Sequence, residues 1–255
     1  MHLDSRSESP LGAAPSVHLH AAGLSYGGEV IFDDLDFDLP AGRTTCLLGP
    51  SGVGKTSLLR MVAGLAHAAQ GEAVDAAGRT LEGRVAYMAQ QDLLLPWLDV
   101  LANVTLGARL RHEPQPKDEA ERLLARVGLT QAARLRPAAL SGGMRQRAAL
   151  ARTLIERRPV VLMDEPFSAL DAITRLELQS LAAELLHGRT VLLITHDPLE
   201  ALRLGHRVLV MAGRPARLET AIEPHGRPPR DPADPEVLQL QGELLARLSH
   251  ARTRA

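Results

Sequence analysis

The pattern of apolar and polar positions divides the chain into short apolar runs and longer amphipathic segments. Apolar runs of strand length occur at 44–48, 160–165 and 190–197, and a segment with helical spacing follows each. Runs without alternation are typical of strands buried on both faces of a parallel sheet. The sequence therefore predicts an α/β core with a mostly parallel sheet, which further strands at 84–88 and 207–211 would complete.

The N-terminal part has a different pattern. Residues 17–21 and 32–39 alternate between apolar and polar side chains, which predicts a small antiparallel β layer, with a further strand at 71–74. Residues 1–15 are polar and contain proline, so we expect a disordered tail. The N-terminal layer and the core together form one predicted domain over 16–220.

Helical spacing dominates the middle and the end of the chain. A first helix is predicted over 57–63, and the pattern from Val100 to Arg136 is helical with interruptions at Pro114 and Pro116. We expect an inserted α-helical subdomain at about 92–157, with a later helix from Ile173 to Leu186. Residues 221–255 are predicted to form a proline-rich loop and a C-terminal helix, with the loop read over 213–235.

Composition narrows the class of protein. The net charge is −1, which gives no reason to expect a nucleic acid partner, and Cys46, the single cysteine, is expected to be buried in a strand. No apolar run approaches the roughly 18 residues of a membrane span, and no apolar leader is visible at the N-terminus. We therefore expect a cytoplasmic protein.

A glycine-rich segment follows the first buried run. Its eight residues fit the pattern G-x-x-x-x-G-K-[ST] of a phosphate-binding loop: Gly49, Pro50, Ser51, Gly52, Val53, Gly54, Lys55 and Thr56. Glycines let backbone N–H groups point at phosphate oxygens, and the following helix, with Ser57 in its first turn, adds its positive end. Lys55 should reach the β- and γ-phosphates, and the Thr56 hydroxyl should bind Mg²⁺. A plain glycine-rich turn is the alternative, but the strand before and the helix after the loop argue against it.

Two acidic residues end a later apolar run. Asp164 and Glu165 follow Val160-Val161-Leu162-Met163, so a strand would deliver both carboxylates to one edge of the sheet. Asp164 would hold Mg²⁺ through water, and Glu165 would polarise the attacking water. The alternative is a pair of surface acids, which the preceding phosphate-binding loop makes the weaker interpretation.

A second anion-binding element is predicted at Ser141. Ser141-Gly142-Gly143 opens a helix that contains Gln146, and a serine-capped helix start is a favourable site for negative charge. A simple helix cap is the alternative for an isolated Ser-Gly-Gly. Tyr26 is open to two interpretations from its residue type, either as a packing side chain or as a flat surface for a base.

Over about 17–215 the chain resembles the nucleotide-binding subunit of an ABC transporter. The resemblance rests on six motifs in the order of that family: Gly49–Thr56, Gln90, Leu140–Gln146, Val160–Glu165, Ser168–Asp171 and His196. Gln91 lies beside Gln90, and the spacing to Pro96-Trp97 favours Gln90 as the family's glutamine. Position 144 is Met, which the family tolerates.

The resemblance implies ATP and Mg²⁺ as ligands and a head-to-tail dimer of two copies. Each ATP would lie between one copy's phosphate-binding loop, with Tyr26 on adenine, and the other copy's Ser141 to Gln146 segment. Thr56, Gln90 and Asp164 would place Mg²⁺ and water. His196 would contact the γ-phosphate and hold water with Glu165. Asp171 would signal between the two sites.

The resemblance also implies a role in transport, with integral membrane permease subunits as direct partners and a solute-binding protein as an indirect one. The subunit would lie at the inner face of the membrane. The segment from Gln90 to Val100, which contains Leu-Leu-Pro-Trp, resembles the corresponding segment of importers of the nitrate, sulfonate and taurine group. Its sequence is most similar to that of the branch for pyrimidine precursors of thiamine. It is expected to receive a helix of the permease, with Trp97 at or beside the contact.

A soluble ABC ATPase of DNA repair or translation is the alternative function. The gap between Thr56 and Ser141 is too short for the long coiled coil of repair members, and only one cassette is found, whereas translation members usually hold two. Both points favour the transporter.

Overall fold

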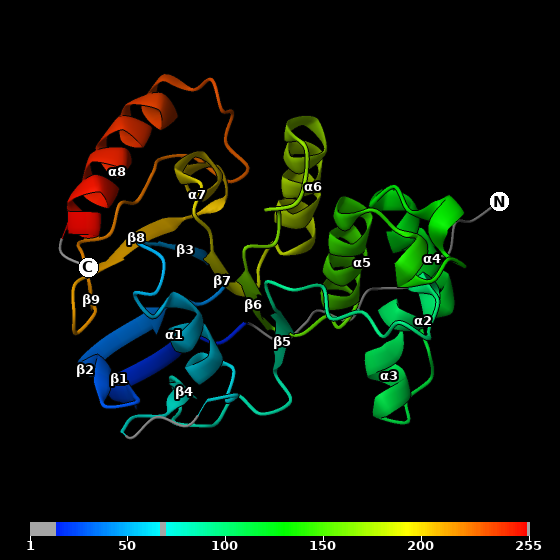
Figure 1. Ribbon diagram of the computed structural model, residues 1–255, viewed down its shortest axis with the longest axis horizontal. Helices are drawn as coiled ribbons and strands as arrows, with labels where there is room; N and C mark the ends of the chain where they lie inside the picture. Colours follow the sequence, from blue (N-terminus) through cyan, green and yellow to red (C-terminus); the bar gives the residue numbers. More distant parts are fainter. Residues whose placement is uncertain (1–13, 67–69, 254–255) are drawn as a thin grey trace.

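The computed structural model describes residues 14–66 and 70–253, so the expected disordered tail lies almost wholly outside the described residues (Figure 1). The described chain contains a three-stranded sheet of order β2-β1-β4 and a six-stranded sheet of order β5-β6-β7-β3-β8-β9. The strands are β1 (Val17–Tyr26), β2 (Glu29–Leu39), β3 (Thr44–Leu48), β4 (Ala73–Asp75), β5 (Val85–Met88), β6 (Val160–Asp164), β7 (Thr190–Ile194), β8 (Arg207–Ala212) and β9 (Arg217–Leu218). The helices are α1 (Lys55–Val62), α2 (Val100–Val104), α3 (Leu106–Leu110), α4 (Lys117–Arg126), α5 (Gly142–Leu154), α6 (Ala172–Leu185), α7 (Pro198–Leu204) and α8 (Pro235–Thr253), with short 3-10 helices η1 (Thr130–Ala132) and η2 (Pro137–Ala139).

The larger sheet is the predicted parallel core. Strands β5, β6, β7, β3 and β8 are all parallel to their neighbours, and only β9 is antiparallel. All five residues of β6 and of β7 are buried, which explains why their sequences are continuous apolar runs. Because the strands are parallel, their carboxyl ends share one edge of the sheet, and the phosphate-binding loop and the acidic pair lie at that edge.

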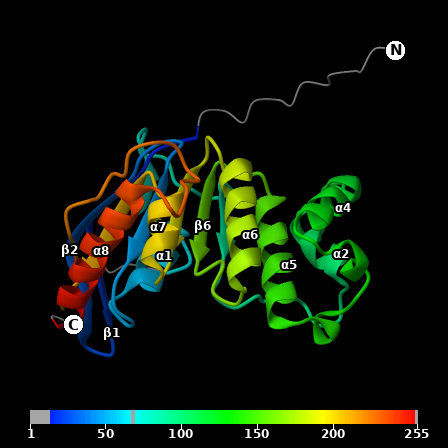
Figure 2. The same ribbon diagram turned by 90° about the horizontal axis from the view of Figure 1, so that it is seen from above.

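Side chains of this sheet alternate between two hydrophobic cores. Cys46 and Leu48 of β3 belong to a core with helices α5 to α8, whereas Leu47 belongs to a core with α1 and the β1–β2 layer. The sheet is therefore covered on both faces, as the two views of the ribbon show (Figures 1 and 2). Cys46 is fully buried, as expected, and burial raises the pKa of its thiol far above the ordinary range.

The helical subdomain differs in detail from the sequence prediction. The expected pattern from Val100 to Arg136 is broken not only around Pro114 but also at Thr105, where α2 ends and α3 begins. The Thr105 hydroxyl donates to the Leu101 carbonyl, and Asn103, fully buried, uses its side chain to hold the chain before α2. Such polar bonding to the backbone competes with a continuous helix.

The C-terminal part also needs one correction. The region 213–235 was predicted to be loop throughout, but β9 lies within it and Ile222 forms a bridge to Val208. The pairing is short because prolines on either side cannot donate to a ladder. The helix α8 begins at Pro235, as predicted, and lies beside α7 in Figure 2. In the described residues no helix is long and apolar enough to cross a membrane.

Candidate nucleotide-binding site

The loop between β3 and α1 has the open backbone that a phosphate cradle needs. Gly49 and Gly54 have positive φ angles of 150° and 112°, which disfavour any side chain. A Cβ at Gly49 would collide with the carbonyl oxygen of Met211, and one at Gly54 would lie 2.7 Å from Ile31. The two glycines therefore allow the loop to pack closely on β2 and on the end of β8.

The side chain of Lys55 contacts the beginning of this loop. Its ammonium donates to the carbonyl oxygens of Gly49 and Pro50, both at 2.8 Å. Burial lowers the pKa of Lys55, and the nearby Glu165 and Asp164 oppose that shift by favouring the charged form. A cation held at the mouth of a backbone cradle fits a phosphate chain as ligand.

Thr56 and Asp164 meet beside the loop. The Thr56 hydroxyl donates to Asp164 Oδ2 at 2.8 Å, although the two residues come from α1 and β6. Burial raises the pKa of Asp164, while the hydrogen bond from Thr56 and the charge of Lys55 act in the opposite direction. A hydroxyl and a carboxylate in contact are oxygen ligands of the kind that Mg²⁺ prefers.

Glu165 is the meeting point of two other predicted residues. Gln90 Nε2 donates to Glu165 Oε2 at 3.3 Å, and His196 Nδ1 lies 3.4 Å from the same oxygen. Glu165 has a φ of 49°, an unusual value for a non-glycine residue, so the backbone turns sharply where the strand ends. Gln90 and the neighbouring Gln91 are both exposed, and the contact with Glu165 is made by Gln90.

The segment around Ser141 is joined to the site through Gln146. Gln146 is 6% exposed, and its amide donates to the Glu165 carbonyl at 2.9 Å while its oxygen accepts from Ala169 N at 2.7 Å. Ser141 caps α5 by accepting from Met144 N at 3.2 Å. Asp171 caps α6, and backbone hydrogen bonding at Thr174 lowers the pKa of its carboxyl.

Two predicted parts of the site are not joined to the loop within one chain. In the described residues no hydrogen bond links Ser141, Gly142, Gly143 or Tyr26 to residues 49–57. Tyr26 ends β1 and is 52% exposed, so its ring is not a core packing residue. One copy therefore offers a half-site for a nucleotide and, elsewhere, a capped helix start.

Glu200 in α7 was missed by sequence reasoning. It is 4% exposed, accepts a 3.0 Å hydrogen bond from Gln179 and lies four residues after His196. Burial raises its pKa to about 7. Its position in an amphipathic helix gave no signal, because only the fold reveals that this face is buried.

The fold and the site define a class: a phosphate-loop ATPase cassette with an inserted helical subdomain. The sequence pattern of the family "ABC transporter" matches residues 32–168. The chain belongs to the ABC transporter family, and it is an ATP-binding subunit that powers transport by ATP hydrolysis.

Several relatives are similar over most of their length. The chain is 41% identical over 248 residues to the aliphatic sulfonates import ATP-binding protein SsuB 2 of Burkholderia cenocepacia, covering 95% of this chain and 91% of the relative. It is 42% identical over 229 residues to SsuB 1 of Pseudomonas savastanoi pv. phaseolicola, covering 89% and 93%. It is 40% identical over 240 residues to an uncharacterized ABC transporter ATP-binding protein of Haemophilus influenzae, covering 91% and 98%.

Solved structures confirm the predicted fold class. A dimeric ATP-binding cassette, MJ0796, in a post-hydrolysis state with ADP and Pi, superposes with a TM-score of 0.73 at 27% identity. The match covers 82% of this chain and 99% of that one. A second dimeric structure of MJ0796, a bacterial ABC transporter cassette, superposes with a TM-score of 0.74.

Proposed function

We propose that this chain hydrolyses ATP to drive the import of aliphatic sulfonates. The assignment of the substrate rests on the similarity to SsuB proteins. This similarity extends over 89–95% of the chain, and so over both the cassette and its C-terminal part. The apolar segment before α2, with its Leu-Leu-Pro-Trp sequence, is consistent with the same group of importers.

The nucleotide is held mainly by the loop from Gly49 to Thr56. Backbone N–H groups bind the phosphates, Lys55 exchanges its carbonyl partners for the β- and γ-phosphate oxygens, and Ser57 adds a polar contact in the first turn of α1. The contact of Thr56 with Asp164 supports a Mg²⁺ ion at this point, with Gln90 completing its shell. The exposed ring of Tyr26 is available for adenine.

Glu165 orients the attacking water. Its carboxylate is already held by Gln90 and faces His196, so water and γ-phosphate would be positioned between these side chains. Little covalent work falls to the protein in phosphoryl transfer, and catalysis depends on position and charge. Gln146 has both ends of its amide engaged, and we assign it to positioning the Glu165 backbone.

A second copy completes each site. Ser141, Gly142 and Gly143 lie at a helix start whose N–H groups suit the γ-phosphate, yet they make no contact with the phosphate-binding loop in their own chain. The dimeric form of MJ0796 supports a head-to-tail pair in which these residues face the partner's nucleotide. Asp171, at the start of α6, would transmit a signal between the two ATP sites of the dimer.

The segment from Gln90 to Val100 is proposed as the permease contact. Leu93 is 58% exposed and Trp97 is 65% exposed, which is unusual for large apolar side chains. Leu93 also lines a groove of about 410 Å³, together with Gln90, Arg145 and their neighbours. A helix of an integral membrane permease that inserts here would touch the same segment that holds Gln90 against Glu165.

Uptake by reconstituted vesicles tests the substrate. The subunit would be assembled with the permease and binding protein encoded beside its gene, and ATP would be enclosed in the vesicles. We expect ATP-dependent uptake of a labelled short alkanesulfonate and no uptake with the Glu165→Gln subunit. Uptake of a hydroxymethylpyrimidine, nitrate or taurine instead would contradict the sulfonate assignment. Copurification with ribosomes or DNA, rather than with a permease, would contradict the transport role.

A further inference from the structure

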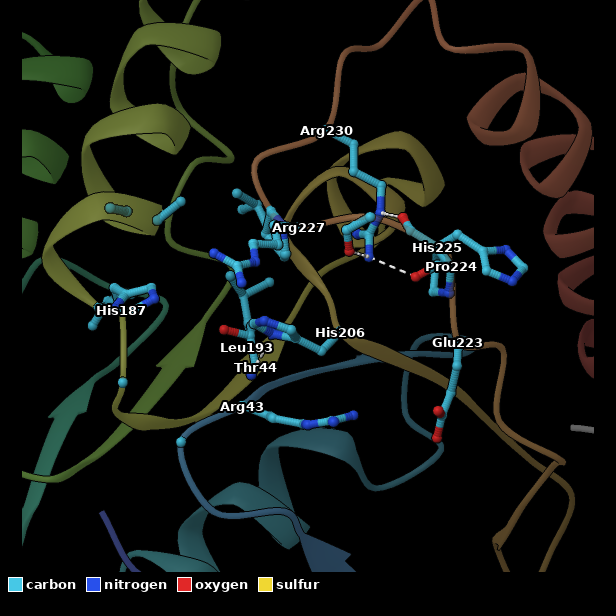
Figure 3. Close-up of a pocket in the computed structure, with 18 of the residues that line it drawn as sticks. Arg43, Thr44, His187, Leu193, His206, Glu223, Pro224, His225, Arg227 and Arg230 are labelled. Carbon is cyan, nitrogen blue, oxygen red and sulfur yellow. Dashed lines mark hydrogen bonds between the residues drawn. The ribbon is translucent and has the colours of Figure 1, made fainter. Parts of the chain in front are cut away.

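A second cavity lies on the face of the sheet that α6 and α7 cover, and it extends to the amino end of β3. It has a volume of about 940 Å³ and opens between the start of β3, the end of α6 and the loop 223–230 (Figure 3). Thr44 lines the cavity at the first residue of β3, whereas the phosphate-binding loop follows the last. The inner wall reaches Met163 and Leu193 near the carboxyl ends of β6 and β7, but none of residues 49–57, 164, 165 and 196 lines the cavity, so it is distinct from the nucleotide site.

Basic side chains surround this cavity. Arg43, Arg227, Arg230 and His187 line it together with His206 and His225, and Glu223 is its single acidic residue. In the part of the chain that the structure describes, no carboxylate forms an ion pair with Arg43 or Arg227. The mouth of the cavity therefore carries unbalanced positive charge.

Arg230 adds a buried charge that is also without a bonded carboxylate. Its guanidinium donates to the backbone carbonyl oxygens of residues 202, 205, 224, 225 and 226, and so holds the loop against α7. It is 7% exposed, so its field is poorly screened by water. The loop wall of the cavity is thus rigid and electropositive.

His206 offers a directed donor. Its Nδ1 accepts from Thr44 N at 3.0 Å, so the neutral ring carries its proton on Nε2. Burial lowers the pKa of His206, and the charges of Arg230, Arg43 and His187 lower it further. The groups that disfavour a protonated His206 are the groups that would favour a bound anion.

The inner wall of the cavity is apolar. It is formed by Met163, Leu186, Leu193 and Leu204, all of them buried, together with Ala182 and Ala183. An inorganic anion would make no apolar contact with this wall, and a neutral alkane would bring no negative charge to the basic mouth. The combination fits a ligand with an anionic head and a short alkyl chain.

We propose that this cavity is a second ligand site, which binds a small aliphatic anion with its head group at Arg43, Arg227 and His206. The alkyl chain would lie against Leu186 and Leu204. Ala182 and Ala183 of α6 line the site and Asp171 lies at the far end of that helix, whereas Leu193 of β7 lies three residues before His196. An occupant would therefore touch elements that run to the nucleotide site.

The test is calorimetric titration of the purified full chain, with Mg-ADP present in excess so that the phosphate-binding loop is occupied. The probes are 1-hexanesulfonate, hexanoate, ethanesulfonate, inorganic sulfate and hexylammonium. We expect both six-carbon anions to bind, with a gain of up to about fourfold for each buried methylene relative to ethanesulfonate. Hexylammonium and sulfate should bind at least tenfold more weakly than hexanesulfonate.

Variants test whether binding depends on the residues of this cavity or on surface charge in general. Arg43→Ala/Arg227→Ala should weaken hexanesulfonate binding at least tenfold, whereas Arg122→Ala/Arg217→Ala makes the same change of charge outside the cavity and should leave it unchanged. Ala183→Phe should remove the dependence on chain length. Binding of hexanesulfonate should also raise the pKa of His206, measured by NMR.

Equal losses in the two double variants, or no binding to the parent chain, would overturn the proposal. So would binding of sulfate as strong as that of hexanesulfonate. Because the titration needs no permease and no uptake, its result is independent of the proposed substrate of transport.

Discussion

At the scale of single residues, the proposed mechanism of hydrolysis depends most on Glu165. Glu165→Gln keeps the shape and the contact with Gln90 but removes the negative charge that orients water. We expect ATP hydrolysis to fall by about 10²- to 10⁴-fold with nucleotide binding retained. Steady-state ATPase assays and nucleotide titrations would measure both. Near-normal turnover would remove Glu165 from the role proposed here.

Substitution of Lys55 should weaken nucleotide binding, which Glu165→Gln should retain. Lys55→Ala removes the cation that spans the mouth of the phosphate-binding loop, so nucleotide binding itself should weaken. Fluorescent ATP titration compares this variant with Glu165→Gln under identical conditions. Unchanged affinity in Lys55→Ala would show that the ammonium does not reach the phosphates.

Glu200 should make stability depend on pH. Its pKa rises from 4.5 to about 7 in the folded chain, so the folded state holds the proton more tightly than the unfolded state. Its contribution to the free energy of unfolding is therefore fully present below pH 4.5 and lost as the pH rises through about 7. Glu200→Gln, which cannot ionise, should gain on the order of 3 kcal/mol relative to the parent chain at pH 8 and little at pH 4.5.

Urea denaturation at both pH values measures this difference, with Glu177→Gln as the control because Glu177 is exposed on α6. If Glu200→Gln and Glu177→Gln show the same small effect at pH 8, the Glu200 carboxylate is not destabilised by burial.

At the scale of elements, we propose that the segment before α2 links the catalytic centre to the permease. Trp97→Ala removes a side chain that is 65% exposed, so the folded subunit should retain its basal ATPase activity. Binding to the permease should weaken, and stimulation by loaded binding protein should fall. Leu110→Ala is a matched control, because Leu110 is 70% exposed in the same helical subdomain. Coupling that is equally normal in both variants would remove Trp97 from the interface.

Elements whose side chains are all buried were predictable from the sequence. Strands β6 and β7 are buried on both faces, so both begin where their apolar runs begin, and they end one and three residues before the predicted ends. The break at Thr105 was not predictable, because it depends on the polar side chains of Thr105 and Asn103 competing with helical hydrogen bonds. The short strand β9 was missed because its pairing with β8 is a tertiary contact of two residues.

At the scale of the whole molecule, the two sites differ in how much the sequence predicted. The proposed nucleotide site is made of contiguous motifs, so its candidate residues could be named from the sequence, although the contacts of Glu165 with Gln90 and His196 needed the fold. The basic cavity draws Arg43, His187, His206 and Arg227 from four separate segments, and none of these residues stands in a local pattern. Only the topology of the sheet and the loop after β9 reveals it.

The dimer is the central claim at this scale, because one copy holds only part of the proposed ATP site. Light scattering coupled to gel filtration would measure the mass of the Glu165→Gln chain with and without Mg-ATP. We expect a dimer with Mg-ATP and a monomer without it. In Glu165→Gln/Ser141→Arg, bulk and charge at the facing helix start should prevent the dimer. A mass that does not change with Mg-ATP, in a chain shown to bind the nucleotide, would contradict the account.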